Sequence, residues 1–395
     1  MTFAIGAVVP WTVPPDWTRG VRERLAWMTD VLTGSLGTPH KRRLRDVPWR
    51  SFSFEVLAAG PDRALLDAQR YDMGGRLWAL PIWQDAQPVA GVVEGAGTIA
   101  CRTAGFDFAP GAQALLMRDA RSWELVTVDA VLPGGVSLQG TTAEAWARGT
   151  RLVPVRQARL IGAPQERLRS DRVGRVQVEF EVDEACTCAP AAWPVMYRGL
   201  PVFDARTDEG SDPTSEFVRP LERIEGDGTG PIDVTDIGGF SSRLQDFRWL
   251  LQGRAAQTAL RARLYALAGR YVTVWLPSGS DDLAPAGSLG GPVLSVRWAG
   301  VAVFGRQQPN RRDLRIELYG GDVLHRRVLQ ATEDGERELL TLDAPLPVAS
   351  PAQVRRISWM SAAQLASDVV EMERSADADG VLRAAVRFES VRHDG

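Results

Sequence analysis

The sequence is poor in the residues that carry most metal and acid–base chemistry. Its 395 residues include three histidines and three cysteines, and Lys41 is the only lysine beside 45 arginines. An odd number of cysteines does not suggest a disulfide framework, and it is typical of a protein kept in a reducing compartment. The near absence of lysine has no cause in folding, and it indicates a GC-rich genome, in which arginine codons are abundant.

Three further absences narrow the class of protein. No apolar run reaches the roughly 18 residues that a membrane-spanning helix needs. The N-terminus has no basic segment, and Pro10 interrupts its apolar run, so no signal peptide is expected. A formal charge of −3 argues against a protein that binds nucleic acid by neutralising phosphates. We therefore expect a soluble protein of the cytoplasm, with enough apolar residues (45%) for several cores.

The few residues suited to chemistry do not stand in the spacing of a known site. His40, His325 and His393 lie in loops or charged segments, without the partners of a metal site or a catalytic triad. Cys101 with the pair Cys186 and Cys188 would supply three thiolates, whereas an iron–sulfur cluster normally takes four. A structural role in a linker is favoured for these cysteines, and a redox or metal role stays open.

The glycine-rich and acidic loops also lack a binding motif. Gly95 and Gly97 are not followed by the helix and the Gly-Lys-Ser pattern of a nucleotide-binding loop. The acidic loop in the second half does not keep the alternating register of a calcium-binding loop; its members are Asp227, Gly228, Asp233 and Asp236. The sequence therefore predicts no catalytic, cofactor-binding or metal-binding residue, and no enzyme.

One stretch, Phe52–Trp83, recurs later in the chain as Phe247–Pro277. Each copy has an aromatic run of period two, a small loop at Gly60 or Gly253, an amphipathic segment, a Gly-Arg pair and an apolar run closed by proline. Period-two runs predict strands, and the apolar spacing between them predicts a short helix. The offset of about 194 residues in a chain of 395 indicates one module repeated head to tail.

Two more segments follow in the same order in both halves. Glu338–Pro347 (ELLTLDAPLP) matches Glu124–Pro133 (ELVTVDAVLP) at seven of ten positions. The run Val386–Val391 (VRFESV) resembles Val178–Val182 (VEFEV), which closes the first half. The ordered recurrence supports duplication of the whole module.

The repeat sets the expected domain boundaries. The first module spans residues 1–190, with its core at about 1–88 and 157–185 and a β-rich, barrel-like insertion at about 89–156. The second spans residues 191–395, with its core at about 191–278 and 360–395 and an insertion at about 279–359. Prolines favour an extended arm over a helix at Val21–Val31, and Lys41–Arg50 is expected to be a basic edge strand.

The repeated strands Leu77–Trp83 and Tyr271–Leu276 are apolar on both faces, so each needs cover on both sides. Trp78, Trp83, Trp249 and Trp275 are expected in the core or at a subunit contact. If Trp83 lies at such a contact, replacing it by Asp should leave expression intact and break assembly.

The unit at Phe52–Trp83 and Phe247–Pro277 resembles the distal tail proteins and tail-tube-like tail-tip (baseplate hub) proteins of long-tailed bacteriophages. The resemblance covers about half of the chain and has no specific motif. It implies a mainly β fold of two tandem tail-tube-like β-sandwich modules, each with a flanking short helix and a small insertion. The Arg-rich composition also suits a phage of a GC-rich bacterium.

In that family, rings of such modules surround the tail channel. Two modules per chain imply a trimer with pseudo-sixfold symmetry, with a hexamer of chains as the alternative. The implied partners are the tail tube protein, the hub and receptor-binding proteins, and genomic DNA that passes without specific binding. The implied location is the distal end of the virion tail, after assembly in the host cytoplasm. A receptor- or glycan-binding module and a cell-wall hydrolase remain the alternatives.

Overall fold

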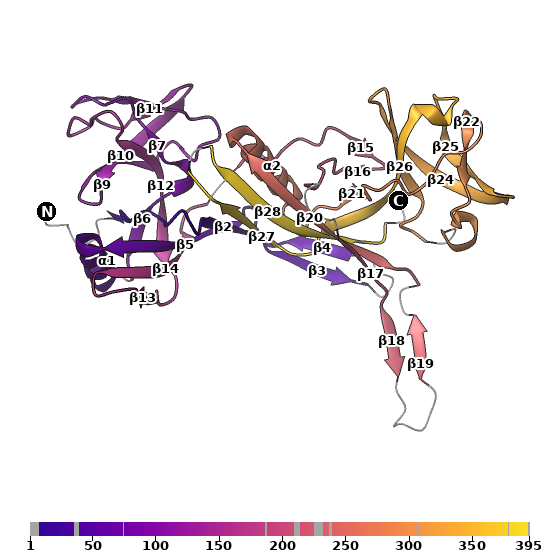
Figure 1. Ribbon diagram of the computed structural model, residues 1–395, viewed down its shortest axis with the longest axis horizontal. Helices are drawn as coiled ribbons and strands as arrows, with labels where there is room; N and C mark the ends of the chain where they lie inside the picture. The colour runs from indigo at the N-terminus through magenta and orange to yellow at the C-terminus, as the bar shows by residue number, and fades with distance from the viewer. Residues whose placement is uncertain are drawn as a thin grey trace.

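The computed structural model describes residues 8–34, 39–73, 75–185, 188–208, 214–224, 232–236, 239–305, 308–377 and 379–393. Within these residues the chain is mainly β, as the sequence predicted, with two α-helices of 14 residues, α1 (Gly60–Met73) and α2 (Arg254–Leu267). Figure 1 shows an elongated molecule, with α1 towards one end and α2 near the middle. Neither described helix is long and apolar enough to cross a membrane.

The strands of the first half fill the chain up to residue 182. They are β1 (Val9–Pro10), β2 (Val21–Ala26), β3 (Thr29–Thr33), β4 (Pro39–Arg43), β5 (Trp49–Ala59), β6 (Leu77–Pro81), β7 (Gln87–Pro88), β8 (Thr98–Ala100), β9 (Gln113–Asp119), β10 (Ser122–Leu132), β11 (Gly135–Leu138), β12 (Arg151–Leu160), β13 (Glu166–Leu168) and β14 (Val173–Val182).

The second half begins with the short hairpin of β15 and β16 and then follows a similar course. Its strands are β15 (Met196–Tyr197), β16 (Leu200–Pro201), β17 (Ser215–Val218), β18 (Leu221–Ile224), β19 (Asp233–Asp236), β20 (Ser242–Gln252), β21 (Val274–Pro277), β22 (Gly291–Arg297), β23 (Asp313–Leu318), β24 (Val323–Asp334), β25 (Arg337–Leu346), β26 (Val354–Leu365), β27 (Val369–Arg374) and β28 (Val381–Ser390).

Antiparallel pairing in the first half runs outward from β5. This strand pairs with β2 and β14; β14 pairs with β12 and β13; and β12 pairs with β6 and β9. Beyond β9 the chain continues through β10 and β11 to β8, which form the insertion.

Pairing in the second half follows the same order. The strand β20 pairs with β17 and β28; β28 pairs with β26 and β27; and β26 pairs with β21 and β23. Beyond β23 the chain continues through β24 and β25 to β22. Each strand named here therefore has a counterpart at the same place in the ladder of the first half.

The registers correct two details of the sequence comparison. Phe54 lies opposite Val178, and Phe247 lies opposite Val386, so Phe247 matches Phe54 rather than Phe52. The similar segments at 124–133 and 338–347 fall on β10 and β25, although the counterpart of β10 is β24. That resemblance is between strands of different position, and it carries no weight for a repeat.

Both helices start after a glycine-containing turn that other residues would strain. Gly60 and Gly253 have positive φ angles of 52° and 82°, in the region that favours glycine. The helix α2 ends at Ala268, which adopts a left-handed conformation and donates its N–H to the Leu264 carbonyl at 3.1 Å. Each helix then leads directly to the central strand β6 or β21.

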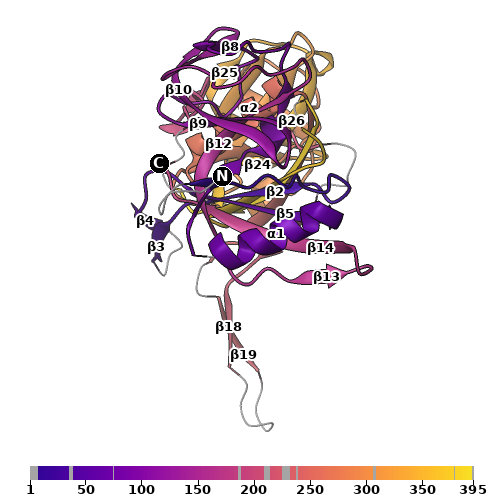
Figure 2. The ribbon, with the colours of Figure 1, turned by 90° about the vertical axis from the view of Figure 1, so that its left-hand side faces the viewer.

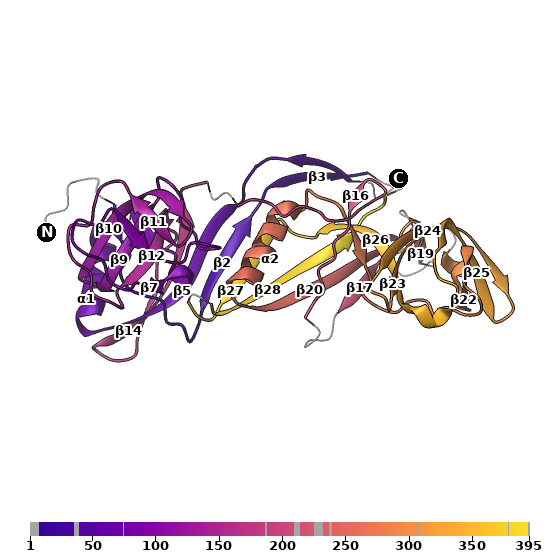
Figure 3. The same ribbon diagram turned by 90° about the horizontal axis from the view of Figure 1, so that it is seen from above.

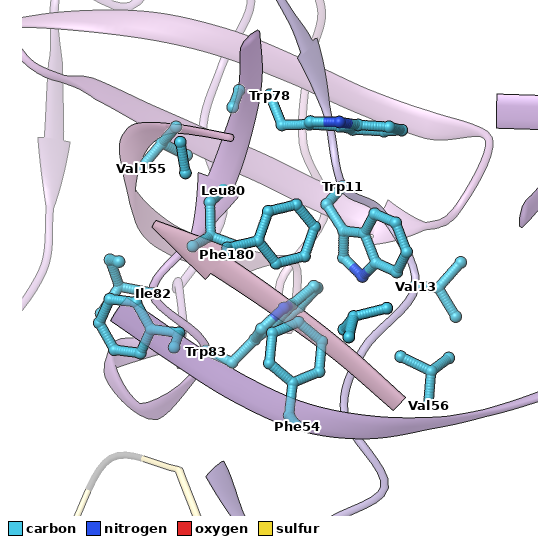
Figure 4. Packing of buried hydrophobic residues seen from close by; sticks show 14 of the residues in the cluster. Trp11, Val13, Phe54, Val56, Trp78, Leu80, Ile82, Trp83, Val155 and Phe180 are labelled. Carbon is cyan, nitrogen blue, oxygen red and sulfur yellow. The ribbon is translucent and has the colours of Figure 1, made fainter. Parts of the chain in front are cut away.

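Buried aromatic rings organise the core of the first half (Figure 4). Trp11 meets Trp78 and Phe180 edge to face, with ring centroids 5.3 and 5.1 Å apart. Burying a side chain of this size contributes roughly 2–3 kcal/mol to stability. A second cluster around Phe247 and Phe388 forms the core of the other half, and each insertion has a cluster of its own.

The expected strand Leu77–Trp83 is buried by this chain itself. Trp78, Trp83, Trp249 and Trp275 are all buried, as the core assignment predicted. Trp83 is only 2% exposed and lies in the first core, so the prediction of a subunit contact at this residue is wrong.

The extended arm at Val21–Val31 is confirmed as strands β2 and β3, whereas Lys41–Arg50 is split between the ends of β4 and β5.

Candidate functional site

The strand β2 joins the two halves into one sheet. It pairs antiparallel with β5 along one edge and with β27 of the second half along the other (Figure 3). Its side chains alternate between buried and exposed positions. Val21 lies in the core of the first half, and Leu25 lies in the core of the second. A strand from the first half therefore completes the sheet of the second.

Trp27 anchors this strand on the end of α2. Its ring meets the Tyr265 ring edge to face at 5.8 Å, and its backbone N–H donates to the backbone carbonyl of Asp368 at 2.9 Å. A Cβ atom at Gly269 would come within 2.8 Å of the Trp27 Cβ, so only glycine lets the two segments approach this closely. The Asp368 carboxylate also accepts from the Thr29 N–H at 2.7 Å.

Glu23 is the centre of a buried charge cluster at the same place. It is fully buried and accepts hydrogen bonds from Arg50 at 2.6 Å, Arg374 at 2.6 Å and Arg261 at 2.5 Å. Burial alone would raise the pKa of Glu23, but the guanidinium groups of these three arginines hold it well below its usual value. Since Arg261 and Arg374 belong to the second half, the carboxylate ties the halves together.

Two aspartates of the first half, Asp85 and the insertion residue Asp107, extend the cluster. Asp107 accepts from Arg156 at 2.7 Å and pairs with Arg50; although burial opposes the charge, these guanidiniums lower the pKa of Asp107 to about 2. Asp85 accepts from Arg254 of α2 at 2.6 Å, and burial raises its pKa against the effect of that arginine. Arg254 also lies over a phenylalanine ring of the insertion, 4.3 Å from the ring centroid of Phe106.

A cavity of about 630 Å³ lies beside the cluster, with walls from both halves. Its lining includes the buried carboxylates of Asp85 and Asp107, which are the kind of group that acts as a catalytic acid or base. Each of these carboxylates accepts a hydrogen bond from a guanidinium group. Such pairing is typical of a structural ion cluster rather than of a catalytic acid and base. The arrangement locks two halves of the chain in one geometry.

The hairpin β3–β4 adds a second contact between the halves. It lies along the second half in Figure 3. Lys41 donates to the Thr273 hydroxyl at 2.7 Å and to the Tyr271 carbonyl at 3.3 Å, in the segment between α2 and β21. Burial, with a smaller effect from Arg270, lowers the pKa of Lys41 to about 8. We call the contacts of β2, Trp27 and β3–β4 with the second half the internal junction.

The second half carries the counterpart of β2 at its outer edge. This strand is β17, which pairs with β20 as β2 pairs with β5. The ladders place Phe217, opposite Arg243, at the position of Leu25, opposite Arg50. Leu25 is 0% exposed in the internal junction, whereas Phe217 is 58% exposed. Across the described residues β17 has no strand on its other side, and we call this the open edge.

The hairpin β18–β19 follows β17 as β3–β4 follows β2. It projects away from the body of the molecule in Figures 1 and 2, and its eight strand residues are all exposed. Leu221, Ile224 and Val234 are each more than half exposed. Apolar side chains this exposed on a two-stranded hairpin are typical of a surface that another molecule covers.

The first half carries the counterpart of the surface that β2 covers. Tyr71 is the twelfth residue of α1, as Tyr265 is of α2, but it is 87% exposed where Tyr265 is 9% exposed. A Cβ atom at Gly75 would meet nothing within 4 Å, in contrast with Gly269. The strand β13 is the counterpart of β27 and pairs, within the described part of the chain, with β14 only. We call β13, Tyr71 and Gly75 the open face; Figure 2 shows the elements α1 and β13 on this side of the molecule.

The histidines lie apart on separate elements. His40 is exposed on β4, and His393 follows β28 and packs edge to face on Trp275. His325 of β24 packs on the Tyr197 ring at 5.6 Å, and burial lowers its pKa to about 4. No pair of histidines is brought together by these contacts.

The cysteines and loops add no metal site among the described residues, where no group of three His, Cys, Asp or Glu side chains is placed to hold an ion. Cys101 lies in the first insertion and Cys188 beside the second core, and Cys186 is outside the described residues. Asp227 and Gly228 are also outside them, whereas Asp233 and Asp236 lie on β19. Gly95 and Gly97 precede the strand β8 rather than a helix.

Sequence reasoning missed the internal junction and its open counterparts. The signal was present in Leu25 and Trp27, apolar residues of an arm outside the repeat, and in Phe217 before the second copy.

In comparisons with known proteins, no family model matches the chain, and no curated protein matches its sequence.

Proposed function

We propose that the chain is a structural protein of the tail tip of a long-tailed bacteriophage. In this proposal it consists of two tandem, duplicated β-sandwich modules of tail-tube type, each with a helix and a barrel-like insertion. Rings of these modules form the distal end of the tail tube, connect it to hub and receptor-binding proteins, and leave a channel for DNA. The protein is assembled in the host cytoplasm and is carried in the virion tail.

Two observations support the duplication. The strand pairings of the halves follow the same order, from β2 to β14 and from β17 to β28. The helices α1 and α2 have the same length and occupy the same place between counterpart strands. A common order of this many non-local pairings is the pattern expected from one module used twice.

The internal junction is the single observation that carries the ring. It joins two modules head to tail through unlike surfaces, because β2 of one meets β27 of the other. A contact between unlike surfaces repeats indefinitely unless rotation closes it into a ring. The outer surfaces of the two modules are the same two kinds, the open edge and the open face. Three chains then supply six modules, the number that the resemblance to tail-tube rings implies.

Mass measurement on the purified protein tests the proposal. We expect a closed particle of three chains, each of 43.1 kDa, that appears in negative stain as a ring with a central hole. A ring of six chains would also support the proposal. A protein that stays monomeric at all concentrations, both alone and when mixed with tail tube protein, would overturn it.

A further inference from the structure

The open edge and the open face correspond to the two surfaces that meet in the internal junction. The open edge is the counterpart of β2, and the open face is the counterpart of the surface that β2 covers. We infer that the open edge (β17 with Phe217) docks on the open face (β13, Tyr71 and Gly75) of a second copy of this chain. The inference deepens the proposed function, since it names the contact by which the ring closes. The contact itself follows from the internal junction alone.

The registers give the residues that meet. In the internal junction Glu23 of β2 lies opposite Met372 of β27. Ser215 is the counterpart of Glu23, because both lie opposite matching residues of the next strand, Gln245 and Phe52. Glu166 is the counterpart of Met372, because they lie opposite matching residues of β14 and β28, Val176 and Ala384. Ser215 should therefore lie opposite Glu166 of the second copy.

Phe217 supplies the apolar part of the contact. Its counterpart Leu25 is buried in the second core, close to the end of α2 that Trp27 covers. In the second copy the same place lies between β13 and the end of α1, where Tyr71 is exposed and Gly75 has open space above it. On the open edge, Arg219 stands at the position of Trp27, so this edge brings no tryptophan ring to the face. Phe217, which is larger than its counterpart Leu25, supplies an aromatic ring there instead. Pro164, the counterpart of Val370, has no N–H to donate. Backbone hydrogen bonds between the two copies are therefore expected only near Ser215.

The hairpin β18–β19 would extend the contact. Its counterpart β3–β4 lies along the neighbouring module and binds the segment after the helix through Lys41. In the second copy the equivalent segment leads from α1 to β6. The exposed side chains of Leu221, Ile224 and Val234 would then be covered rather than solvated.

Charge substitution at the contact tests the inference. Phe217→Glu should weaken association by about 30-fold or more, as expected when a central aromatic anchor is lost. Phe304→Glu is the matched control, because Phe304 is also exposed (75%) but lies in the second insertion, away from both surfaces. Its assembly should equal that of the parent. Assembly of Phe217→Glu at parental affinity would overturn the inference.

Mixing two defective chains separates this contact from other modes of assembly. Phe217→Glu disables the edge and leaves the face intact, whereas Tyr71→Glu disables the face and leaves the edge intact. Each alone should be monomeric, and an equimolar mixture should form heterodimers, because one edge and one face remain. Failure of the mixture to associate, when each single variant folds with the parental circular dichroism spectrum, counts against head-to-tail docking.

Oxidative cross-linking gives a direct measure of register. A chain with both Ser215→Cys and Glu166→Cys should form disulfide-linked multimers that close on themselves, whereas the parent and each single variant should not. Rings that assemble without this cross-link, and that tolerate Phe217→Glu, would leave the proposed function standing and overturn the contact. Cross-linked open chains without any ring would support the contact and overturn the ring.

Discussion

The rings of Trp27 and Tyr265 meet edge to face at 5.8 Å, although one belongs to the first half of the chain and the other to the second. The counterpart of Tyr265 is Tyr71, which has no such cover and is 87% exposed. Tyr265 is thus covered by a ring from the other half of the chain, whereas Tyr71, at the matching position of α1, is open. Substitutions made in parallel at both places separate the stability of the chain from its assembly.

Gly269 and Gly75 provide the first such pair. Gly269→Ala should destabilise the protein by about 1–3 kcal/mol, because φ is +65° and the new Cβ would meet the Trp27 Cβ at 2.8 Å. Gly75→Ala should change the stability of the monomer by less than about 0.5 kcal/mol, since its Cβ meets nothing within 4 Å. Urea denaturation of both variants measures the difference. Equal losses of stability would contradict the view that only one of these surfaces is covered.

Glu23→Gln tests the charge cluster. Three arginines converge on this buried carboxylate, so its loss leaves buried guanidinium charges uncompensated and should cost about 3–5 kcal/mol. Glu371→Gln is the control, because its pair with Arg22 is 3.8 Å long and about half exposed, and such pairs contribute about 0–1 kcal/mol. The measurement is the shift in thermal midpoint of each variant. A shift for Glu23→Gln as small as that of the control would show that the cluster does not hold the halves together.

The sequence predicted the mainly β class and the places of both helices, because period-two runs and a glycine at each helix start are local signals. It could not predict the internal junction. Leu25 and Val370 are 345 residues apart, and nothing local in either segment marks the other as its partner. The similarity at Glu124–Pro133 and Glu338–Pro347 misled for a related reason, since strands of like amphipathic pattern resemble one another whatever their position in a sheet.

Trp83, at the end of the first copy of the repeated stretch, shows the same limit. An apolar run is compatible with a core or with a subunit contact, and only the fold decides between them. Since Trp83 is 2% exposed in the first core, Trp83→Ala should lower stability by about 3–5 kcal/mol, and Trp83→Asp should prevent folding. Trp49→Ala, at a position 57% exposed, should cost under about 1 kcal/mol. Comparison of soluble yield and denaturant midpoint checks both; a folded, soluble Trp83→Asp chain would contradict the burial.

Lys41 makes the stability of the internal junction depend on alkaline pH. Its pKa is lowered to about 8 in the folded chain, by burial and then by Arg270, from 10.5 in the unfolded chain. Between these values the unfolded chain binds the proton more tightly, so the free energy of unfolding rises with pH across this window. The cost of holding a half-buried ammonium is present at pH 7 and has gone by about pH 10.5.

Lys41→Met and Lys41→Arg isolate that effect, because neither residue changes its charge in the window and all other alkaline titrations are shared with the parent. The parent should gain stability relative to both variants as pH rises from 7 to 10. Urea denaturation of the three proteins at pH 7, 8, 9 and 10 gives the differences. Three parallel curves would mean that the pKa of Lys41 is not lowered in the folded chain, and that its amine is not buried against the second half.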